Sequence, residues 1–347
     1  MVSTLSANVV GLQTDILRFL TLSPIVTDSG HLFSWVNPEH AGYVYPEGMG
    51  LYLTLVSQLA AVRDDAQMAA CVGKVAIAMQ EIATPHGALG LRGHLYPFDT
   101  CMGVTGLCAY KRYLGGGIDA DLLGRMASFI IDMAGRRLTI LNPDGSSPDV
   151  APSWSATFGA SMLKEVIALD DLARETGEER YRTLAMEIAD EVIDTSYDEG
   201  SFHVYPRDKA VYTHPHCYAL EGLLHLRSRG YRDTTPLLRA GADKLSEWQD
   251  EDGGQWNWNA AWAGVSGRQR LKVGDASAQA VRIWLAVDRE GYRLQIERGL
   301  AFLASIRSPQ GGLYYAAGSR DVNAITSIFA AQAMEWYLRE PRPDAIA

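Results

Sequence analysis

The stretch GMGLYLTLVSQLAA, residues 48–61, decides the fold, because it is long enough for a helix and carries no charged residue. A helix that is apolar on nearly every side must be buried on most of its faces. Its Gly, Ala, Ser and Thr residues let neighbouring helices approach closely. Other segments nearly free of charge are TCMGVTGLCAY (100–110), SWSATFGASML (153–163), CYALEGLLHL (217–226), DASAQAVRIWLAV (275–287) and VNAITSIFAAQAMEWY (322–337).

These charge-poor segments alternate with helical segments that carry a normal charged stripe, such as residues 171–194 and 290–306. Alternating buried and half-solvated helices, joined in series, indicate an inner ring shielded by an outer ring. The sequence therefore predicts an all-α fold, an (α/α)6 toroid of about six helical hairpins in a single domain over 1–340, with a frayed tail at 341–347. An open solenoid of helix pairs is the alternative. Helical periodicity predicts helices at 8–20, 49–63, 66–83, 100–113, 119–134, 154–175, 178–193, 216–229, 235–248, 275–287, 290–306 and 322–338.

The loops before the charge-poor segments repeat a polar turn that contains glycine. Such turns occur at 142–147, 197–205, 249–256 and 308–315, roughly 45–60 residues apart. Glycine supplies the positive φ that stops a helix. This spacing fits one hairpin and its loop per repeat, with short β pieces expected near Ser201–Tyr205.

Composition excludes several classes of protein. A net charge of −10 without a Lys/Arg cluster argues against nucleic-acid binding. The first twenty residues lack the basic start and apolar run of a signal peptide, and no stretch is long enough to span a bilayer, so we expect a cytoplasmic location. The four scattered cysteines predict reduced, buried thiols. The oligomeric state stays open.

Several polar residues stand at or just before the start of a charge-poor helix: Glu47, Asp99, His214, His216, Asp275 and Asp321. If the inner helices surround an axis, these residues converge at one end of the ring. Acidic residues at such positions also serve as helix caps, and capping alone remains an alternative for each of them. Aromatic neighbours favour chemistry, since a carboxyl group beside aromatic walls can have a raised pKa and act as a general acid.

The His214-Pro-His216 motif places two imidazoles around a rigid residue at the start of an otherwise apolar helix. A structural role is as plausible as a functional one. Tyr212 and Arg207 lie close in sequence, and His and Tyr are common proton donors and acceptors beside a carboxylate that an Arg neutralises.

The loops concentrate aromatic residues outside the helical stripes. Such rings suit stacking against sugars, or stabilisation of a carbocation in a terpene cyclase. The residues expected to bind substrate are Trp35, Tyr45, Trp154, Arg207, Trp256, Trp258, Tyr314, Arg320 and Asp321.

Gln249, Gly253 and Trp256, with the Gly311-Gly312-x-Tyr314 turn, resemble repeats of the prenyltransferase and squalene-cyclase group. The number of hairpins resembles the six-hairpin glycosidases, which include hydrolases, lyases and sugar epimerases. Residues 273–285 and 321–337 look like parts of helical toroid proteins of bacterial polysaccharide metabolism. The chain lacks the Asp-x-Asp-Asp run that resemblance to terpene cyclases would imply.

Asp99-x-Cys101 is similar to the zinc ligands of protein prenyltransferases, but the matching His is not at the expected separation. The zinc motifs of lanthionine-cyclase-like toroids are also missing. We therefore expect no metal and no cofactor.

The leading hypothesis is a carbohydrate-active enzyme that binds an oligosaccharide or another small molecule in an axial cleft. For glycoside hydrolysis we expect Asp99 and Asp275 to form the catalytic pair, with Glu47 in reserve. For a lyase or epimerase acting on a uronic-acid-containing glycan we expect His214, His216 and Tyr212, with Arg207 or Arg320 holding the carboxylate. The alternatives are a terpene-cyclase or prenyltransferase-like enzyme and a non-catalytic glycan-binding toroid.

Overall fold

The computed structural model describes residues 4–150, 153–204, 211–258 and 269–347. Twelve α-helices lie within these ranges. The first set comprises α2 (Pro46–Arg63), α4 (Pro97–Leu114), α6 (Glu165–Thr176), α8 (Thr213–Ser228), α10 (Gly274–Asp288) and α12 (Ala324–Leu338). All are poor in charge except α6, which carries Glu165, Asp170, Asp171, Arg174 and Glu175. The helices between them are α1 (Thr4–Leu22), α3 (Ala66–Ile82), α5 (Ala120–Arg136), α7 (Glu179–Ser196), α9 (Thr235–Trp248) and α11 (Arg293–Ser305).

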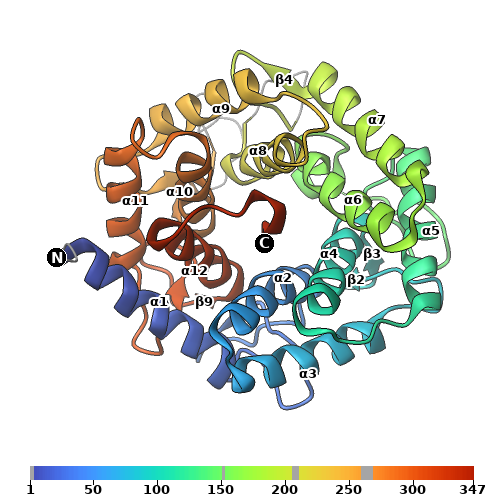
Figure 1. Cartoon of the computed structure of the whole chain (residues 1–347), viewed down its shortest axis with the longest axis horizontal. Helices are drawn as coiled ribbons and strands as arrows, with labels where there is room; N and C mark the ends of the chain where they lie inside the picture. Colours follow the sequence, from blue (N-terminus) through green and yellow to red (C-terminus); the bar gives the residue numbers. More distant parts are fainter. Residues whose placement is uncertain (1–3, 151–152, 205–210, 259–268) are drawn as a thin grey trace.

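The helices form two concentric rings (Figure 1). The inner ring runs α2, α4, α6, α8, α10 and α12, each helix packing on the next, and α12 returns to contact α2. Each inner helix also packs against at least one outer helix, with α1 covering α12. Because the inner ring closes on itself, the (α/α)6 toroid is confirmed and the open solenoid is excluded.

Glycine makes the inner ring tight between α2 and α4. A Cβ added to Gly50 would lie 2.2 Å from the carbonyl oxygen of Met102, and one added to Gly106 would lie 2.5 Å from that of Gly50. The two backbones therefore meet where any side chain would force them apart.

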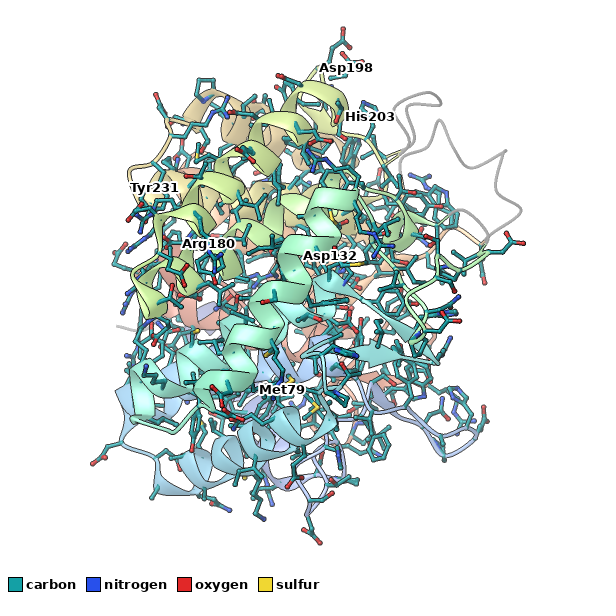
Figure 2. The ribbon with its side chains drawn as sticks, turned by 90° about the vertical axis from the view of Figure 1, so that its right-hand side faces the viewer. Met79, Asp132, Arg180, Asp198, His203 and Tyr231 are labelled. Atoms are coloured by element: carbon teal, nitrogen blue, oxygen red, sulfur yellow. The ribbon has the colours of Figure 1, made fainter. Side chains whose placement is uncertain are left out.

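The outer helices are solvated on one side, as their charged stripes predict. Asp132 on α5 and Arg180 on α7 are exposed, whereas Met79 on α3 is buried (Figure 2). Cys101, Cys108 and Cys217 are buried free thiols, and Cys71 is only partly buried. Over the described part of the chain, no helix has the length and apolar character needed to cross a membrane.

Short antiparallel strands shape the loops that precede the inner helices. β1 (Trp35–Val36) pairs with β9 (Val322–Asn323), which also pairs with β8 (Leu313–Tyr314). This small sheet joins the loop before α2 to the loop before α12, so it fastens the first repeat to the last. The other pairs are β2 (Gly90–Leu91) with β3 (His94–Leu95), β4 (Tyr197–Asp198) with β5 (Ser201–Phe202), and β6 (Gln255–Trp256) with β7 (Lys272–Val273).

The helix predicted over 154–175 is wrong in its first half. Residues Trp154–Ala156 and Ala160–Lys164 form two 3-10 helices, η1 and η2, and the α-helix begins only at Glu165. Ser, Thr and Gly between 153 and 159 are poor helix formers, which explains the irregular start. The segment instead carries Trp154 toward the cleft described below.

The frayed tail predicted at 341–347 is also wrong. The side chains of Ala345–Ala347 are at most 4% exposed, and Figure 1 shows the end of the chain inside the ring. Gln332 donates to the carbonyl of Ala345, and the Ala347 carbonyl accepts from Lys164 Nζ and Arg282 Nη1, each at 2.8 Å. Buried polar groups require partners, and the tail satisfies two buried cations.

Candidate active-site cleft

The first turns of the inner helices bring chemistry-bearing side chains to one end of the ring. Glu47 and Asp99 lie in the first turns of α2 and α4, whose starts are fixed by proline at the first helical position. His214 and Asp275 lie in the first turns of α8 and α10. All of them line a cleft with two compartments.

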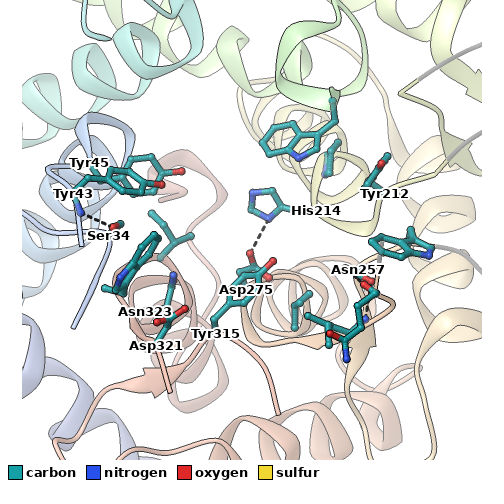
Figure 3. Close-up of a pocket in the computed structure, with 18 residues that line it drawn as sticks. Ser34, Tyr43, Tyr45, Tyr212, His214, Asn257, Asp275, Tyr315, Asp321 and Asn323 are labelled. Atoms are coloured by element: carbon teal, nitrogen blue, oxygen red, sulfur yellow. Dashed lines mark hydrogen bonds and ion pairs between the residues drawn. The ribbon is translucent and has the colours of Figure 1, made fainter. Parts of the chain in front are cut away.

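The larger compartment, of about 560 Å³, is called here the Asp275 compartment (Figure 3). It is lined by Ser34, Trp35, Tyr43, Tyr45, Trp154, Tyr212, His214, Pro215, Asn257, Trp258, Gln269, Leu271, Val273, Asp275, Tyr315, Asp321, Asn323 and Ile325. The smaller one, of about 240 Å³, is called the Asp99 compartment. It is lined by Tyr45, Glu47, Leu91, Arg92, Tyr96, Phe98, Asp99, Trp154, Ser155, Ser161 and Met162. Because both contain Tyr45 and Trp154, the two compartments adjoin.

Glu47 is held by two tyrosine hydroxyls. Tyr45 donates to Oε2 and Tyr218 donates to Oε1, each at 2.5 Å, while the residue is only 5% exposed. Burial raises the pKa of Glu47, and the two hydrogen bonds and the positive charge of Lys164 oppose that rise. These partners favour the ionised carboxylate.

Asp99 has the opposite environment. It is 6% exposed, and its Oδ2 is buried without a hydrogen-bond partner among the described residues. Burial raises the pKa of Asp99 well above its usual value, and the negative charge of Glu47 raises it further. A neighbouring pair of carboxyl groups with opposed environments splits into one acid and one anion.

Asp275 faces His214 in the other compartment, with 3.8 Å between Oδ2 and Nδ1 (Figure 3). The N–H of Ala276 donates to Asp275 Oδ1 at 2.7 Å. Burial raises the pKa of Asp275 to about 7, against the effect of that backbone hydrogen bond. This carboxyl therefore gains or loses its proton near neutral pH.

The imidazole of His214 is enclosed by aromatic rings. Its centroid lies 4.2 Å from that of Tyr218 and 5.6 Å from that of Trp154. Burial lowers the pKa of His214 to about 3, and the positive charge of Lys164 adds to the effect. His214 is therefore neutral, and its Nδ1 has no hydrogen-bond partner within the described ranges.

Most of the residues predicted for the site meet in this cleft. Of the expected catalytic set, Glu47, Asp99, Tyr212, His214 and Asp275 line it. Of the expected binding set, Trp35, Tyr45, Trp154, Trp258 and Asp321 line it. Arg207 lies outside the described residues.

His216 lies away from the lining of both compartments, because residues two apart on a helix point to opposite sides. It is fully buried, and its Nδ1 accepts from the Phe202 N–H at 3.1 Å. Its Nε2 lies 3.3 Å from the Gly241 carbonyl oxygen. Both ring nitrogens are thus engaged by backbone groups, which is a structural role.

Three predicted binding residues also lie away from the lining. Trp256 is covered by Arg270 and Lys272, whose charges stand 4.3 and 5.4 Å from its ring centroid. Tyr314 belongs to β8, and its neighbour Tyr315 lines the cleft instead, since adjacent strand residues face opposite sides. Arg320 is 61% exposed and pairs with Glu39.

Four further residues of the site were not predicted from the sequence: Arg92, Tyr218, Asn257 and Asn323. Tyr218 could have been found, because it follows His214 by four residues and shares its helix face.

No family model matches the chain, and no curated protein matches it. Solved structures do. They include the cellobiose 2-epimerase from Spirochaeta thermophila DSM 6192, with a TM-score of 0.68 and 14% identity over 97% of this chain and 100% of that chain. A sugar epimerase from a ruminal bacterium gives a TM-score of 0.73 and 11% identity over 94% and 98%.

An unsaturated glucuronyl hydrolase from Streptococcus agalactiae, complexed with dGlcA-GalNAc6S, gives a TM-score of 0.69 and 13% identity over 98% and 93% of the two chains. At these identities the likeness establishes architecture. The chain shares its (α/α)6 toroid fold with these structures.

Proposed function

We propose that the protein is a carbohydrate-active enzyme that cleaves a glycosidic bond of an oligosaccharide by acid–base catalysis. The observation that carries this proposal is the separation of roles among carboxyl groups facing one cleft. Burial raises the pKa of both Asp99 and Glu47, but only Glu47 has tyrosine hydroxyls that stabilise its anion, so Asp99 is the better proton donor of the two. Asp275, with a pKa of about 7, stands in the adjoining compartment.

In this proposal Asp99 protonates the leaving-group oxygen, and Asp275 is the base that activates water. Glu47 stabilises the positive charge that develops on the sugar ring. Since Asp99 and Asp275 line different compartments that meet at Tyr45 and Trp154, the scissile bond would lie at that junction, with one sugar on each side.

The shape and walls of the cleft support a sugar ligand. Cavities of about 300–1,000 Å³ with aromatic walls and a few polar groups are typical of small-molecule sites. The Asp275 compartment, at about 560 Å³, has rings from Trp35, Trp154 and Trp258 in its lining. The epimerases and the hydrolase of similar fold are sugar-processing enzymes by name.

A lyase or epimerase reaction on a uronic-acid-containing glycan is the second candidate. The observation that favours it is the neutral His214, whose unpaired Nδ1 stands 3.8 Å from Asp275 Oδ2. In this reading His214 and Asp275 pass a proton to and from the sugar carbon, and Tyr212 lines the same compartment.

Single substitutions test the proposal. A thermal-shift screen against neutral and acidic oligosaccharides first selects a ligand, because binding raises the melting temperature. Asp99→Asn, Asp275→Asn and His214→Gln are then assayed for release of reducing ends and for the absorbance of unsaturated products.

For a hydrolase, we expect Asp99→Asn and Asp275→Asn to lower kcat at least about 100-fold, as loss of a general acid or base does. The wild-type rate should rise as the pH passes through about 7, because Asp275 must be ionised to act as base. Glu165→Gln is the matched control, since Glu165 is a buried first-turn carboxyl of α6 that lines neither compartment.

The second candidate would be selected if His214→Gln loses more activity than the other two variants and the wild type forms an unsaturated or epimerised product. Full activity in all three variants would remove both. Turnover of polyprenyl diphosphates by the wild-type protein would replace them with a prenyl-transfer or cyclase function.

A further inference from the structure

Arg92 occupies a position in the backbone that its side chain does not favour. Gly90 pairs with Leu95 and Leu91 pairs with His94, which leaves Arg92 and Gly93 as a two-residue hairpin turn. Their φ angles are +52° and +84°. Turns with two positive φ values strongly favour Asn-Gly, Asp-Gly or Gly-Gly, because other side chains crowd the backbone there. A residue held in such a conformation at a cleft suggests a function.

The side chain of Arg92 stands at the Asp99 compartment. Its Cζ lies 4.7 Å from the ring centroid of Tyr43, so the guanidinium rests on an aromatic face. Its positive charge lowers the pKa of Tyr43 and of Tyr96, although burial dominates and raises both. Arg92 therefore lies among the rings that wall the compartment.

Arg92 is an exposed residue, so its guanidinium is open both to solvent and to a ligand. Over the described ranges, no carboxylate forms an ion pair with Arg92, although most of the arginines there have such a partner. No other described lysine or arginine lines either compartment. A guanidinium fixed on a ring still has free N–H groups for two parallel hydrogen bonds to an oxyanion.

We propose that Arg92 is a specificity-determining residue that binds an anionic substituent, a carboxylate or a sulfate ester, on the sugar held in the Asp99 compartment. This assignment rests on the proposed function for the identity of the ligand as a sugar. In this arrangement the charged substituent of the sugar lies at the β2–β3 turn, and its glycosidic bond lies toward Asp99. Neutral sugars would lack the contact.

The key variant is Arg92→Asn, because asparagine suits the turn better than arginine. Binding is measured by isothermal titration calorimetry with three probes. They are a glucuronate-containing disaccharide, its carboxyl-reduced neutral counterpart, and a disaccharide whose only charged group is a sulfate ester. Arg320→Gln is the matched control, an exposed arginine outside the cleft.

We expect Arg92→Asn to weaken binding of an anionic probe about 10- to 100-fold, as loss of a charged hydrogen-bonding pair does. Affinity for the neutral disaccharide and the melting temperature should stay equal or rise. The probe that loses affinity tells whether the substituent is a carboxylate or a sulfate. Arg320→Gln should bind every probe like the wild type.

Equal affinity of the wild type for anionic and neutral probes would overturn the inference. An Arg92→Asn variant that loses the same factor of affinity for both kinds of probe would also overturn it. No binding of either anionic probe would also overturn it. If the wild type turns over sugars and Arg92→Asn leaves KM unchanged, the inference fails and the proposed function stands. If an anionic probe binds through Arg92 but no sugar is turned over, the proposed function fails and the anion site stands.

Discussion

Replacing Asp275 with asparagine should make the protein more stable at alkaline pH while it removes activity. The Asp275 side chain is 13% exposed, and burial raises its pKa to about 7, compared with about 3.9 in an unfolded chain. The folded state therefore holds this proton more tightly than the unfolded state. Stability falls as the pH rises from about 4 to about 7, and the loss is complete above that range.

The size of this stability change follows from the difference between the folded and unfolded pKa values of Asp275. Each pKa unit corresponds to 1.36 kcal/mol, so ionised Asp275 costs the fold about 4 kcal/mol above pH 7. Asp275→Asn abolishes the ionisation and keeps an oxygen that can accept the Ala276 N–H. We expect the variant to match the wild type near pH 4 and to exceed its free energy of unfolding by about 2–4 kcal/mol at pH 8.

Urea unfolding at several pH values between 4 and 9, followed by tryptophan fluorescence, measures this difference. Glu165→Gln is again the control: burial raises the pKa of Glu165 to about 8, so its stability gain should also build up from about pH 4 but become complete only above about pH 8. That variant should keep its activity, because Glu165 lines neither compartment. A difference between Asp275→Asn and wild type that does not vary with pH would refute the reasoning, as would a variant less stable than wild type at pH 8.

The remaining predictions concern packing and buried charge. Glu221→Gln should lower the free energy of unfolding by about 3–5 kcal/mol in urea titrations, because it strips Lys164 and Arg282 of their anion; a loss below about 1 kcal/mol would contradict this. His216→Ala should lower the melting temperature yet leave kcat of the folded enzyme unchanged, unlike changes at His214; a kcat loss would speak against the structural role. Gly50→Ala should cost about 1–3 kcal/mol or prevent folding, measured by thermal unfolding, because its Cβ would strike the backbone of α4; wild-type stability would disprove that contact.

The inner ring of helices was predictable because most of its segments contain very few charged residues. A segment such as 48–61 cannot leave any face in water, so it needs neighbours on every side. A closed inner ring provides them. The charged stripe over 171–194 was a poorer guide, because residues 171–176 belong to the inner helix α6 and the outer helix α7 begins only at Glu179. Glu47 and Asp99 were expected at one end because each stands at or just before a charge-poor segment. In the structure α2 begins at Pro46, one residue before Glu47, and α4 begins at Pro97, two residues before Asp99.

The details of the site depended on orientation, which composition does not contain. His214 and His216 were predicted together, although a helix turns them to opposite sides. Tyr314 was chosen over Tyr315 for the same kind of reason, since the strand alternation there could not be phased from the sequence. Arg92 was missed because nothing local tells which loop arginine lacks an internal partner. That information exists only when all the carboxylates have been placed.

A few charged residues in or beside the charge-poor segments both hold the inner ring together and affect the pKa values of the cleft. Glu221 of α8 binds Lys164 and Arg282, and the carbonyl of Ala347 closes the cluster inside the ring. Each of these side chains is about 1% exposed, so none could be tolerated without the others.

Lys164 of this cluster also acts on the side chains of the cleft, through its contacts and its charge. Lys164 Nζ lies 4.5 Å from the ring centroid of Tyr218, whose hydroxyl donates to Glu47. The Lys164 charge lowers the pKa of both Glu47 and His214, and so favours an ionised carboxylate and a neutral imidazole at once. The same buried cation that binds Glu221 of α8 and the Ala347 carbonyl therefore helps to set the protonation states on which the proposed catalysis depends.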